Sequence, residues 1–461
     1  MSGIARYGTY LPYYRLQRTA IGAGKGERAV ASYDEDSTSM AVEAGREALA
    51  GANQIDTLIF TTLSPAYAEK LNAATVGSAL DLSGSLRSIE LGASSRMGLS
   101  ALLLGADIAA SGDQVLVCAA DVSVGAPGGS RETTGGDGAA AFVMGSDDDA
   151  IAKLVGRASA TAELLDTYRV PSDRFPKQWE ERFGADIMAP VIQDVATRAL
   201  KAAGTEPTEL KAVILDGANP RALAGLPRAL GLKPEQLADN LAADVGRIGT
   251  AHAGLLLARA LDTASAGDRI LVVSAADGCD AAIFEVTSRI AEGRPARSVD
   301  HWRGSKSNEL PYNTYLKWRG VLPFEPPRRP DPDRPGAPPS HRHLRWKMGF
   351  VGSRCNACGA VHLPPQRTCV ACGAVDELKD EPMSSVDCKV ATFTLDHLAY
   401  SLQPPVVAAV IDFDGGGRCP CELTDVDPAD VEIGLELEMS FRNLFTVQGV
   451  HNYFWKARPR R

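Results

Sequence analysis

The chain has 461 residues with a formal net charge of −9, and 45% of its residues are hydrophobic while 23% are charged. This length exceeds the roughly 100 to 200 residues of one domain, so it predicts at least two domains and a large buried core. No stretch approaches the roughly 18 consecutive apolar residues of a membrane helix, which excludes a predicted membrane span. The first residues lack the basic and apolar regions of a secretory signal, so we expect a cytoplasmic protein.

The acidic balance and the cysteine count exclude two further classes. A net negative charge disfavours a general polyanion-binding protein. Nine cysteines, an odd number over such a length, argue against a disulfide framework. The cysteines are then metal ligands, a catalytic thiol or buried packing residues, and Cys118 and Cys279 lie in or beside apolar strands where packing is expected.

A helix and a strand are predicted near the start of the chain. Asp36 or Ser37 is suited to cap a helix whose apolar residues run from Met40 to Leu49. Residues 57–60 are then predicted to form a buried strand. Helices and strands alternate in this way through the first part of the chain.

An internal repeat organises the first 290 residues, with one copy at residues 98–143 and the other at 254–284. Each copy opens with Gly-Leu and passes through a helix-like stretch to a Gly-Asp turn, an apolar strand, a loop and a second apolar strand. We predict a duplicated α/β unit in which helices cover mostly parallel strands, with both halves packed into one domain.

The opening residues 3–16, residues 27–41 and residues 267–274 resemble the prokaryotic HMG-CoA synthases. With the repeat, they make the chain similar to the HMG-CoA synthase and ketoacyl-ACP synthase III branch of the thiolase superfamily. The resemblance implies a thiolase-like α/β/α/β/α domain over residues 1–290. It also implies an acyl-CoA substrate and a tight homodimer.

The positions that carry catalysis in this family hold other residues here. The family's nucleophilic Cys, at the start of a buried helix, corresponds to Ser95. The general-base His corresponds to Asp216, and the Asn of a later Gly-Asn pair corresponds to Arg247. Asn219 is retained and is the candidate contact to the acyl-CoA, while the acidic base of HMG-CoA synthases falls near Leu63 and is missing.

These replacements change the chemistry that is possible. Ser95 requires an adjacent base to attack a thioester, because a hydroxyl is far less acidic than a thiol. Asp216 is a weak base unless burial raises its pKa, and a nearby Arg247 would lower that pKa. The three residues are either a redesigned acid-base site or an ion pair in an inactive pocket. His252 and Tyr67 are further candidate proton-transfer residues, and each is also open to a structural role.

A basic, proline-rich segment follows the first domain. Residues 291–350 hold twelve Lys or Arg against six Asp or Glu, and eight of the eighteen residues 322–339 are Pro. Proline fixes φ and removes a backbone donor, so we predict a linker over residues 291–345. The positive charge of this segment either holds it against the acidic body of the protein or binds phosphate.

Two CxxC pairs carry the strongest local motif, Cys355 with Cys358 and Cys369 with Cys372, with ten residues between the pairs. Four thiolates at this spacing close a tetrahedral Zn²⁺ site that has no open coordination position. We therefore predict a zinc ribbon over residues 346–378 whose zinc is structural.

Short apolar strands separated by Gly-, Pro- and Asp-rich turns predict a small barrel over residues 379–461. With the Cys pairs, this region resembles the acyl-CoA-associated zinc-ribbon plus OB-fold family, whose members occur beside or fused to thiolase-like proteins. The resemblance implies a metabolic role and a larger complex with another acyl-CoA enzyme. The pattern gives no role to Cys388, Cys419 and Cys421.

A nucleic-acid partner is the rival interpretation of a zinc ribbon joined to an OB fold, because both folds commonly bind single strands. The acidic chain and the lack of a Lys/Arg cluster in the barrel before its last residues argue against it. We predict no nucleic-acid partner.

Together these patterns predict an acyl-CoA enzyme, a lyase or acyltransferase, that makes or breaks a C–C bond beside the thioester without a Cys nucleophile. Aldol chemistry needs fixed donors for an enolate and a proton-transfer residue, but no acyl-enzyme. The alternatives are an inactive acyl-CoA-binding or scaffolding subunit and, third, a conventional HMG-CoA synthase. The acyl group and the direction of reaction stay open.

Overall fold

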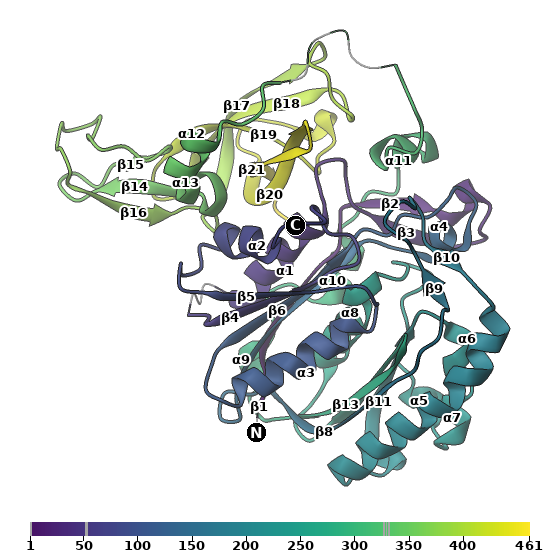
Figure 1. The fold of residues 1–461 in the computed structure, drawn as a ribbon. Coiled ribbons are helices and arrows are strands. Elements are labelled where there is room, and N and C mark those ends of the chain that lie inside the picture. Colours follow the sequence, from purple (N-terminus) through teal and green to yellow (C-terminus); the bar gives the residue numbers. More distant parts are fainter. Residues whose placement is uncertain (1, 51–53, 326–327, 329, 331) are drawn as a thin grey trace. The chain divides into compact units, whose positions relative to one another are not determined.

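The structure is a computed structural model that describes residues 2–50, 54–325, 328, 330 and 332–461 (Figure 1). It divides into two compact units, each discontinuous in sequence. The first consists of Met1–Ala31, Met40–Ala74 and Leu82–Leu310, and the second of Ser32–Ser39, Thr75–Asp81 and Pro311–Arg461. Among the described helices, none is long and apolar enough to cross a membrane.

A nine-stranded sheet forms the framework of the first unit. Its strands are β1 (Ser2–Tyr10), β4 (Thr57–Thr61), β5 (Arg87–Leu91), β6 (Val115–Asp121), β7 (Gly138–Ser146), β8 (Ala152–Thr161), β11 (Leu210–Gly217), β12 (Arg269–Ala275) and β13 (Gly278–Val286). Their order is β11-β12-β13-β8-β1-β7-β6-β4-β5 (Figure 1). Two residue pairs between β1 and β8 join the half-sheets, which correspond to the two copies of the sequence repeat.

The prediction of mostly parallel strands was wrong. The strand β4 runs parallel to β5 and β6, and β11 runs parallel to β12, but the remaining neighbours in the sheet are antiparallel. In each copy the two apolar strands are consecutive in the sheet. The strand β12 reaches β13 through a tight turn at Asp277 with φ of 51°, while β6 reaches β7 through a longer loop that holds one short helix, Ser130–Thr134. Both connections return the chain to the neighbouring strand without crossing the sheet, so both pairs are antiparallel, because a parallel pair requires a crossover.

Helices fill the space between the half-sheets and cover their outer faces. Between the half-sheets, α3 (Met97–Ala109) packs on β6 and β7, and α8 (His252–Thr263) packs on β11 and β12. On the outer faces, α5 (Glu181–Ala203) packs on β8 and β13, and α1 (Ser37–Leu49) approaches β1. A Cβ at Gly8 of β1 would lie 2.6 Å from the Ala44 carbonyl oxygen, which explains the glycine there. The predicted α/β/α/β/α layering is confirmed (Figure 1).

The basic segment after residue 290 belongs to the first unit as far as Leu310. Arg297 lies 3.1 Å from Glu47, and Lys306 pairs with Glu27. These pairs agree with the interpretation that its positive charge holds the segment against the acidic body of the protein. Residues 326, 327, 329 and 331 of the predicted linker lie outside the described residues. The smaller elements of this unit are β2 (Tyr14–Gln17), β3 (Glu27–Val30), α4 (Ser130–Thr134), β9 (Thr167–Tyr168), β10 (Lys177–Gln178), α6 (Pro220–Leu223), α7 (Leu226–Ala229), α9 (Ile290–Gly293) and α10 (Val299–Gly304).

The second unit contains two antiparallel sheets. The smaller sheet consists of β14 (Val351–Cys355), β15 (Val361–His362) and β16 (Leu378–Pro382). The larger consists of β17 (Cys388–Asp396), β18 (Val406–Phe413), β19 (Arg418–Glu422), β20 (Glu436–Val447) and β21 (Val450–Pro459), in the order β19-β18-β17-β20-β21. A bridge between Leu423 and Ala457 brings the chain after β19 to β21, so the five strands curl into a barrel.

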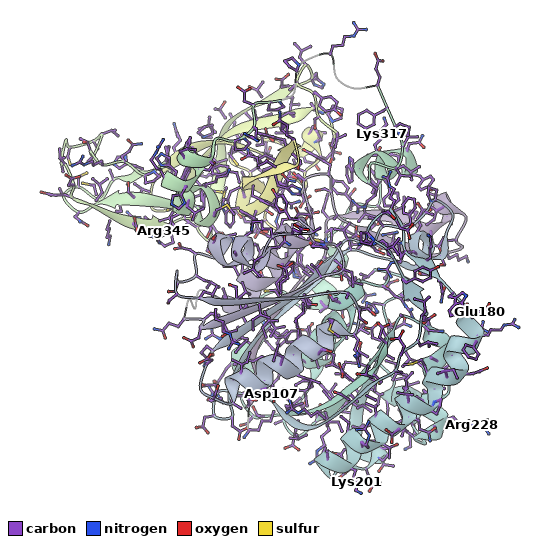
Figure 2. All side chains as sticks on the ribbon, viewed as in Figure 1. Asp107, Glu180, Lys201, Arg228, Lys317 and Arg345 are labelled. Atoms are coloured by element: carbon purple, nitrogen blue, oxygen red, sulfur yellow. The ribbon has the colours of Figure 1, made fainter. Side chains whose placement is uncertain are left out.

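Short helices and an exposed ion pair complete the second unit. The helices are α2 (Ala73–Ala79), which begins in the first unit, α11 (Tyr312–Trp318), α12 (Ala337–Arg342) and α13 (Leu344–Gly349). Arg345 of α13, labelled in Figure 2, lies 2.7 Å from Asp81. Trp455 in the barrel core donates a hydrogen bond to the Met348 carbonyl at 2.7 Å, which ties α13 to β21.

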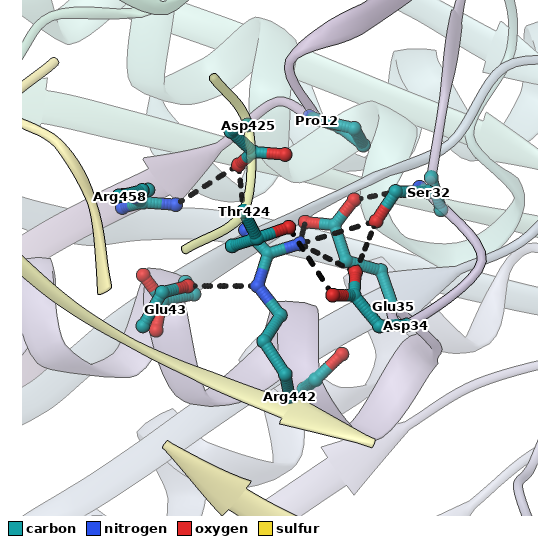
Figure 3. Close-up of polar contacts among 12 residues, drawn as sticks. Pro12, Ser32, Asp34, Glu35, Glu43, Thr424, Asp425, Arg442 and Arg458 are labelled. Atoms are coloured by element: carbon teal, nitrogen blue, oxygen red, sulfur yellow. Dashed lines mark hydrogen bonds and ion pairs between the residues drawn. The ribbon is translucent and has the colours of Figure 1, made fainter. Parts of the chain in front are cut away.

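A buried ion cluster holds the segment Ser32–Ser39 within the second unit (Figure 3). Arg442 of β20 is fully buried, with its guanidinium 3.2 Å from Asp34 and 2.6 Å from Asp425. Lys456 of β21, also buried, lies 3.0 Å from the other carboxylate oxygen of Asp34. Two strands of the barrel thus bind one carboxylate from the start of the chain.

Burial and ion pairing act in opposite directions on Asp34. Burial raises the pKa of this carboxyl, but Lys456 and Arg442 outweigh it and hold the pKa below its ordinary value. The ionised group therefore stabilises the fold above its unfolded pKa of about 3.8, and this contribution is lost as the pH falls through the lower folded pKa.

Replacing Asp34 by Asn is expected to lower the free energy of unfolding at pH 7 by about 3 kcal/mol or more, because it leaves two buried cations short of a carboxylate. Denaturant unfolding of the full chain, monitored by circular dichroism, measures this free energy of unfolding. The control is Asp430→Asn, an exposed change in the same unit that should alter stability by less than about 0.5 kcal/mol. Equal stability of the two variants would contradict the role assigned to Asp34.

Candidate functional site

Ser95 lies at the start of the buried helix α3. After β5 the chain turns through Ala93, which has φ of 76°, and the helix begins at Met97. Gly98 in the first turn approaches the Thr250 carbonyl oxygen so closely that a Cβ would lie 1.8 Å from it. The position expected from the family resemblance is therefore at the amino end of a helix in the middle layer.

Asp216 and Arg247 come from the part of the chain that precedes the second copy of the repeat. Asp216 is buried at the carboxyl end of β11, where Ser274 Oγ donates to its Oδ2 at 3.4 Å. Arg247 precedes α8, and its Nη1 donates to the Gly217 carbonyl at 3.0 Å. Burial lowers the pKa of Arg247, and the nearby charge of Asp216 raises it. Arg247 is thus anchored to the backbone beside Asp216, and no ion pair joins the two among the described residues.

One cavity of about 390 Å³ brings these three candidates together. Ser95, Asp216 and Arg247 all line it. A second cavity of about 560 Å³ includes Leu63 in its wall. Both cavities share Arg131 as a lining residue. The sequence-based grouping of three distant residues therefore corresponds to one place in the first unit.

The other two proton-transfer candidates lie outside the described walls of both cavities. His252 is the first residue of α8 and is buried, with its ring bound to the Asn240 backbone. Burial lowers the pKa of His252, so the imidazole is neutral at neutral pH. Tyr67 lies in the loop after β4, where its backbone N–H donates to Asn72 Oδ1 at 3.1 Å.

Asn219 caps a helix next to the cavity. Its Oδ1 accepts a hydrogen bond from the Arg221 backbone at 3.2 Å, and its Nδ2 donates to the Glu181 carbonyl at 2.9 Å. The side chain therefore connects the first turn of α6 to the start of α5. Its neighbours Ala218 and Pro220 line the cavity.

Asp121, which the sequence did not single out as a functional residue, connects the loops around both cavities. At the carboxyl end of β6, its Oδ1 accepts from Leu63 N at 2.6 Å and Thr62 Oγ1 at 2.9 Å, and also from Ser64. Its Oδ2 accepts from Thr250 N at 2.6 Å. Burial raises the pKa of Asp121, while these hydrogen bonds lower it. The available signal was the Ala-Ala-Asp that ends this strand and recurs within the second copy of the repeat, at residues 275–277.

Arg131 is the second residue that sequence reasoning missed. It lies on the short helix α4, within the Gly- and Ser-rich loop between β6 and β7, and lines both cavities. An arginine in such a loop is ordinarily a solvated surface residue, so the sequence carried no signal for it.

The four zinc-ribbon cysteines converge in the second unit. Their sulfur atoms all lie within 4.8 Å of one another, with 3.7 Å between Cys355 and Cys372 and 3.5 Å between Cys358 and Cys369. The glycine after each pair has φ of 78° or 79°, the left-handed turn that a CxxC knuckle needs. Four thiolates fit Zn²⁺ and leave no coordination position for a substrate, so the zinc is structural.

Family comparisons define the class of protein. Residues 200–286 match the 3-oxoacyl-[acyl-carrier-protein] synthase III C-terminal domain. Residues 349–376 match the rubredoxin-like zinc ribbon domain of ChsH2, and residues 382–442 match its C-terminal OB-fold domain. The chain is thus a thiolase-like protein that carries a zinc ribbon and an OB fold, as the sequence predicted.

Curated relatives identify the family more closely. The hydroxymethylglutaryl-CoA synthase of Methanopyrus kandleri is 32% identical over 70% of this chain and 98% of its own length. That of Methanosphaera stadtmanae is 28% identical over 70% of this chain and 99% of its own length. The chain belongs to the hydroxymethylglutaryl-CoA synthase family.

Solved structures agree with the fold. An HMG-CoA synthase complexed with CoA has a TM-score of 0.58 at 20% identity, covering 68% of this chain and 89% of that one. The 3-oxoacyl-[acyl-carrier-protein] synthase III from Aquifex aeolicus has a TM-score of 0.55 at 22% identity, covering 62% of this chain and all of that one. At these identities the likeness establishes the thiolase-like fold of the first unit.

Replacing Cys358 by Ser is expected to abolish bound zinc, because three thiolates bind Zn²⁺ far more weakly than four. Metal analysis of the purified chain should give about one zinc per chain for the unmodified protein and none for the variant. The control Cys421→Ser changes another thiol of the same unit and should keep the metal. Zinc retained at full stoichiometry in Cys358→Ser would contradict the four-cysteine site.

Proposed function

We propose that the chain binds an acyl-CoA thioester in the 390 Å³ cavity and makes or breaks a C–C bond beside the thioester carbon by aldol chemistry. The observation that carries this proposal is the convergence of Ser95, Asp216 and Arg247 on that cavity. Membership in the hydroxymethylglutaryl-CoA synthase family supports the choice of an acyl-CoA ligand, since a related fold is solved with CoA bound.

Ser95 is assigned a donor role rather than a nucleophilic one. Its Oγ is buried and has no hydrogen-bond partner among the residues that the structure describes. A serine nucleophile requires a base within hydrogen-bond reach to take its proton, and no described side chain fills that position. A free hydroxyl in the cavity wall is instead suited to donate a hydrogen bond to the thioester carbonyl.

Asp216 and Arg247 are assigned proton transfer and charge stabilisation. In the cleavage direction, Asp216 takes the proton of a β-hydroxyl, the Cα–Cβ bond breaks, and its electrons form the thioester enolate as an aldehyde or ketone leaves. The enolate carbon then receives the proton back from Asp216. Arg247 and Ser95 stabilise the enolate oxygen. Bond formation is the reverse sequence, so neither direction requires an oxidant or an acyl-enzyme.

The second candidate is an acyl-CoA-binding subunit without catalysis. It is favoured by the replacement of the family's Cys, His and second Asn by Ser95, Asp216 and Arg247. Such a subunit would bind thioesters and leave them unchanged, and it would work beside another acyl-CoA enzyme. A homodimer stays a prediction from the family resemblance under either candidate.

Replacing Asp216 by Asn is expected to lower kcat/KM by about 10²- to 10⁴-fold, because an amide cannot accept the proton. A panel of acyl-CoA and β-hydroxyacyl-CoA thioesters, with aldehydes added for the synthetic direction, is assayed by mass detection of products. His252→Gln serves as the comparison, since His252 lies outside the cavity wall and should change the rate less. Turnover that is unaffected by Asp216→Asn would exclude this mechanism, and binding without turnover would favour the second candidate.

The absence of an acyl-enzyme is a separate prediction. Intact-mass analysis after mixing the chain with the turned-over thioester is expected to show no acyl adduct. Ser95→Ala should reduce kcat/KM by about tenfold through loss of one hydrogen bond. Its matched control is Ser94→Ala, because Ser94 Oγ is also buried and unpaired but Ser94 does not line the cavity. An adduct that disappears in Ser95→Ala would instead make Ser95 a nucleophile.

A further inference from the structure

The second unit contains a cavity of about 470 Å³ that has no described lining residue in common with the two cavities of the first unit. Residues of α12, α13, β20 and β21 line it (Figure 1). Its apolar wall consists of three aromatic rings, Trp346, Phe445 and Phe454, together with one leucine and three prolines. The volume falls in the range of about 300 to 1,000 Å³ that small-molecule sites occupy.

Two of these rings form a corner in the cavity wall. The Trp346 indole stacks on Phe350, with 4.8 Å between the ring centroids and 25° between the ring planes. Phe350 is fully buried and lies outside the wall, so the opposite face of the indole is the one left for the cavity. Phe454 meets the indole at 64°, with 5.4 Å between centroids. A flat ring fits this corner better than a flexible chain does, because aromatic rings gain from stacked and edge-to-face contacts.

Lys347 places a positive charge beside these rings. The residue lines the cavity and is partly buried, and its Nζ donates a hydrogen bond to Asn452 Oδ1 at 2.8 Å. Burial lowers the pKa of Lys347, and no carboxylate forms an ion pair with it within the part of the chain that the structure describes. An ammonium group has three donors, so two remain for a ligand.

The charges of the wall limit the kind of anion that fits. Lys347 is the one lysine or arginine among the described lining residues, and Asp333 adds a negative charge to the same wall. A phosphate with two charges calls for more cations than this, whereas a single carboxylate matches one ammonium group. A hydrogen bond between two charged groups is also about twice as strong as one between neutral groups.

We propose that this cavity binds a planar aromatic monocarboxylate, with its ring on the Trp346 indole and its carboxylate accepting hydrogen bonds from Lys347 Nζ. This site belongs to the second unit alone. It is therefore independent of the acyl-CoA binding proposed for the first unit.

The test titrates the full chain by calorimetry with 2-naphthoate and with 2-naphthamide, which has the same rings but no charge. The acid is expected to bind about 10- to 100-fold more tightly than the amide, as for a hydrogen bond to a charged group. Lys347→Met should remove this preference and leave the affinity for the amide unchanged. Equal binding of acid and amide to the unmodified chain, binding of neither, or a preference that survives in Lys347→Met would each overturn the proposal.

Two further ligands distinguish an aromatic acid from other anions. Decanoate carries its carboxylate on a flexible aliphatic chain, and AMP carries a phosphate on a nucleoside with a flat base. Both are expected to bind about tenfold more weakly than 2-naphthoate, because decanoate cannot stack on the indole and the AMP phosphate finds only one cation. Decanoate binding as tightly as 2-naphthoate would identify an aliphatic acid site, and AMP binding as tightly would identify a nucleotide site. Either result overturns the proposal.

Two more variants separate recognition from folding. Lys379→Met removes an exposed lysine of the same unit that does not line the cavity, so the preference for the acid should persist. Lys347→Gln removes the charge but keeps a side-chain donor for Asn452, so it should lose the preference and melt close to the temperature of the unmodified chain. If Lys347→Gln keeps the preference that Lys347→Met loses, Lys347 serves to hold α13 on β21, and the proposal is overturned.

Discussion

The carboxylate of Asp121 is the constraint on which the walls of both cavities depend. It fixes the loop after β4 through Leu63 and the turn before α8 through Thr250, so it joins the segments that precede the two copies of the repeat. The space around it is closed, since a Cβ at Gly249 would lie 2.2 Å from an Asp121 oxygen. The loop after β4 and the backbone that precedes α8 are therefore held together by one buried carboxylate.

This arrangement lets the cavity change its chemistry while the fold persists. Asp121 and the close approach of Gly98 to Thr250 maintain the middle layer without any contribution from Ser95 or Asp216. The side chains that line the cavity can then be replaced without loss of the backbone geometry. Asp216 and Arg247 line the cavity at positions where the family resemblance predicts an imidazole and an amide, and the proposed function assigns them proton transfer and charge stabilisation.

The sequence predicted the features that depend on residues close together in the chain, and it missed those that depend on contacts between distant residues. The zinc site was predictable because its ligands occur as two local turns, and the layered fold because helix and strand patterns recur in both copies. The direction of the strands was not predictable, because an apolar run does not reveal whether its neighbours in the sheet are parallel or antiparallel. Asp121 acts through partners far away in the chain, since Thr250 lies 129 positions after it. Arg131 lies in a Gly- and Ser-rich loop, where an arginine carries no sequence signal. Ser95, Asp216 and Arg247 could be grouped only through the family resemblance, and the structure alone gives the anchoring of Arg247 to Gly217.

The ion cluster around Arg442 has a consequence for the gene as well as for the fold. Asp34 and Arg442 lie 408 residues apart, yet both belong to the second unit. Within one chain the partners are held at a high effective concentration, so the cluster forms at any dilution. If the zinc ribbon and barrel were encoded as a separate polypeptide, the same contacts would become an intermolecular bond that weakens with dilution. Covalent fusion therefore makes completion of the barrel independent of how much of each part the cell synthesises.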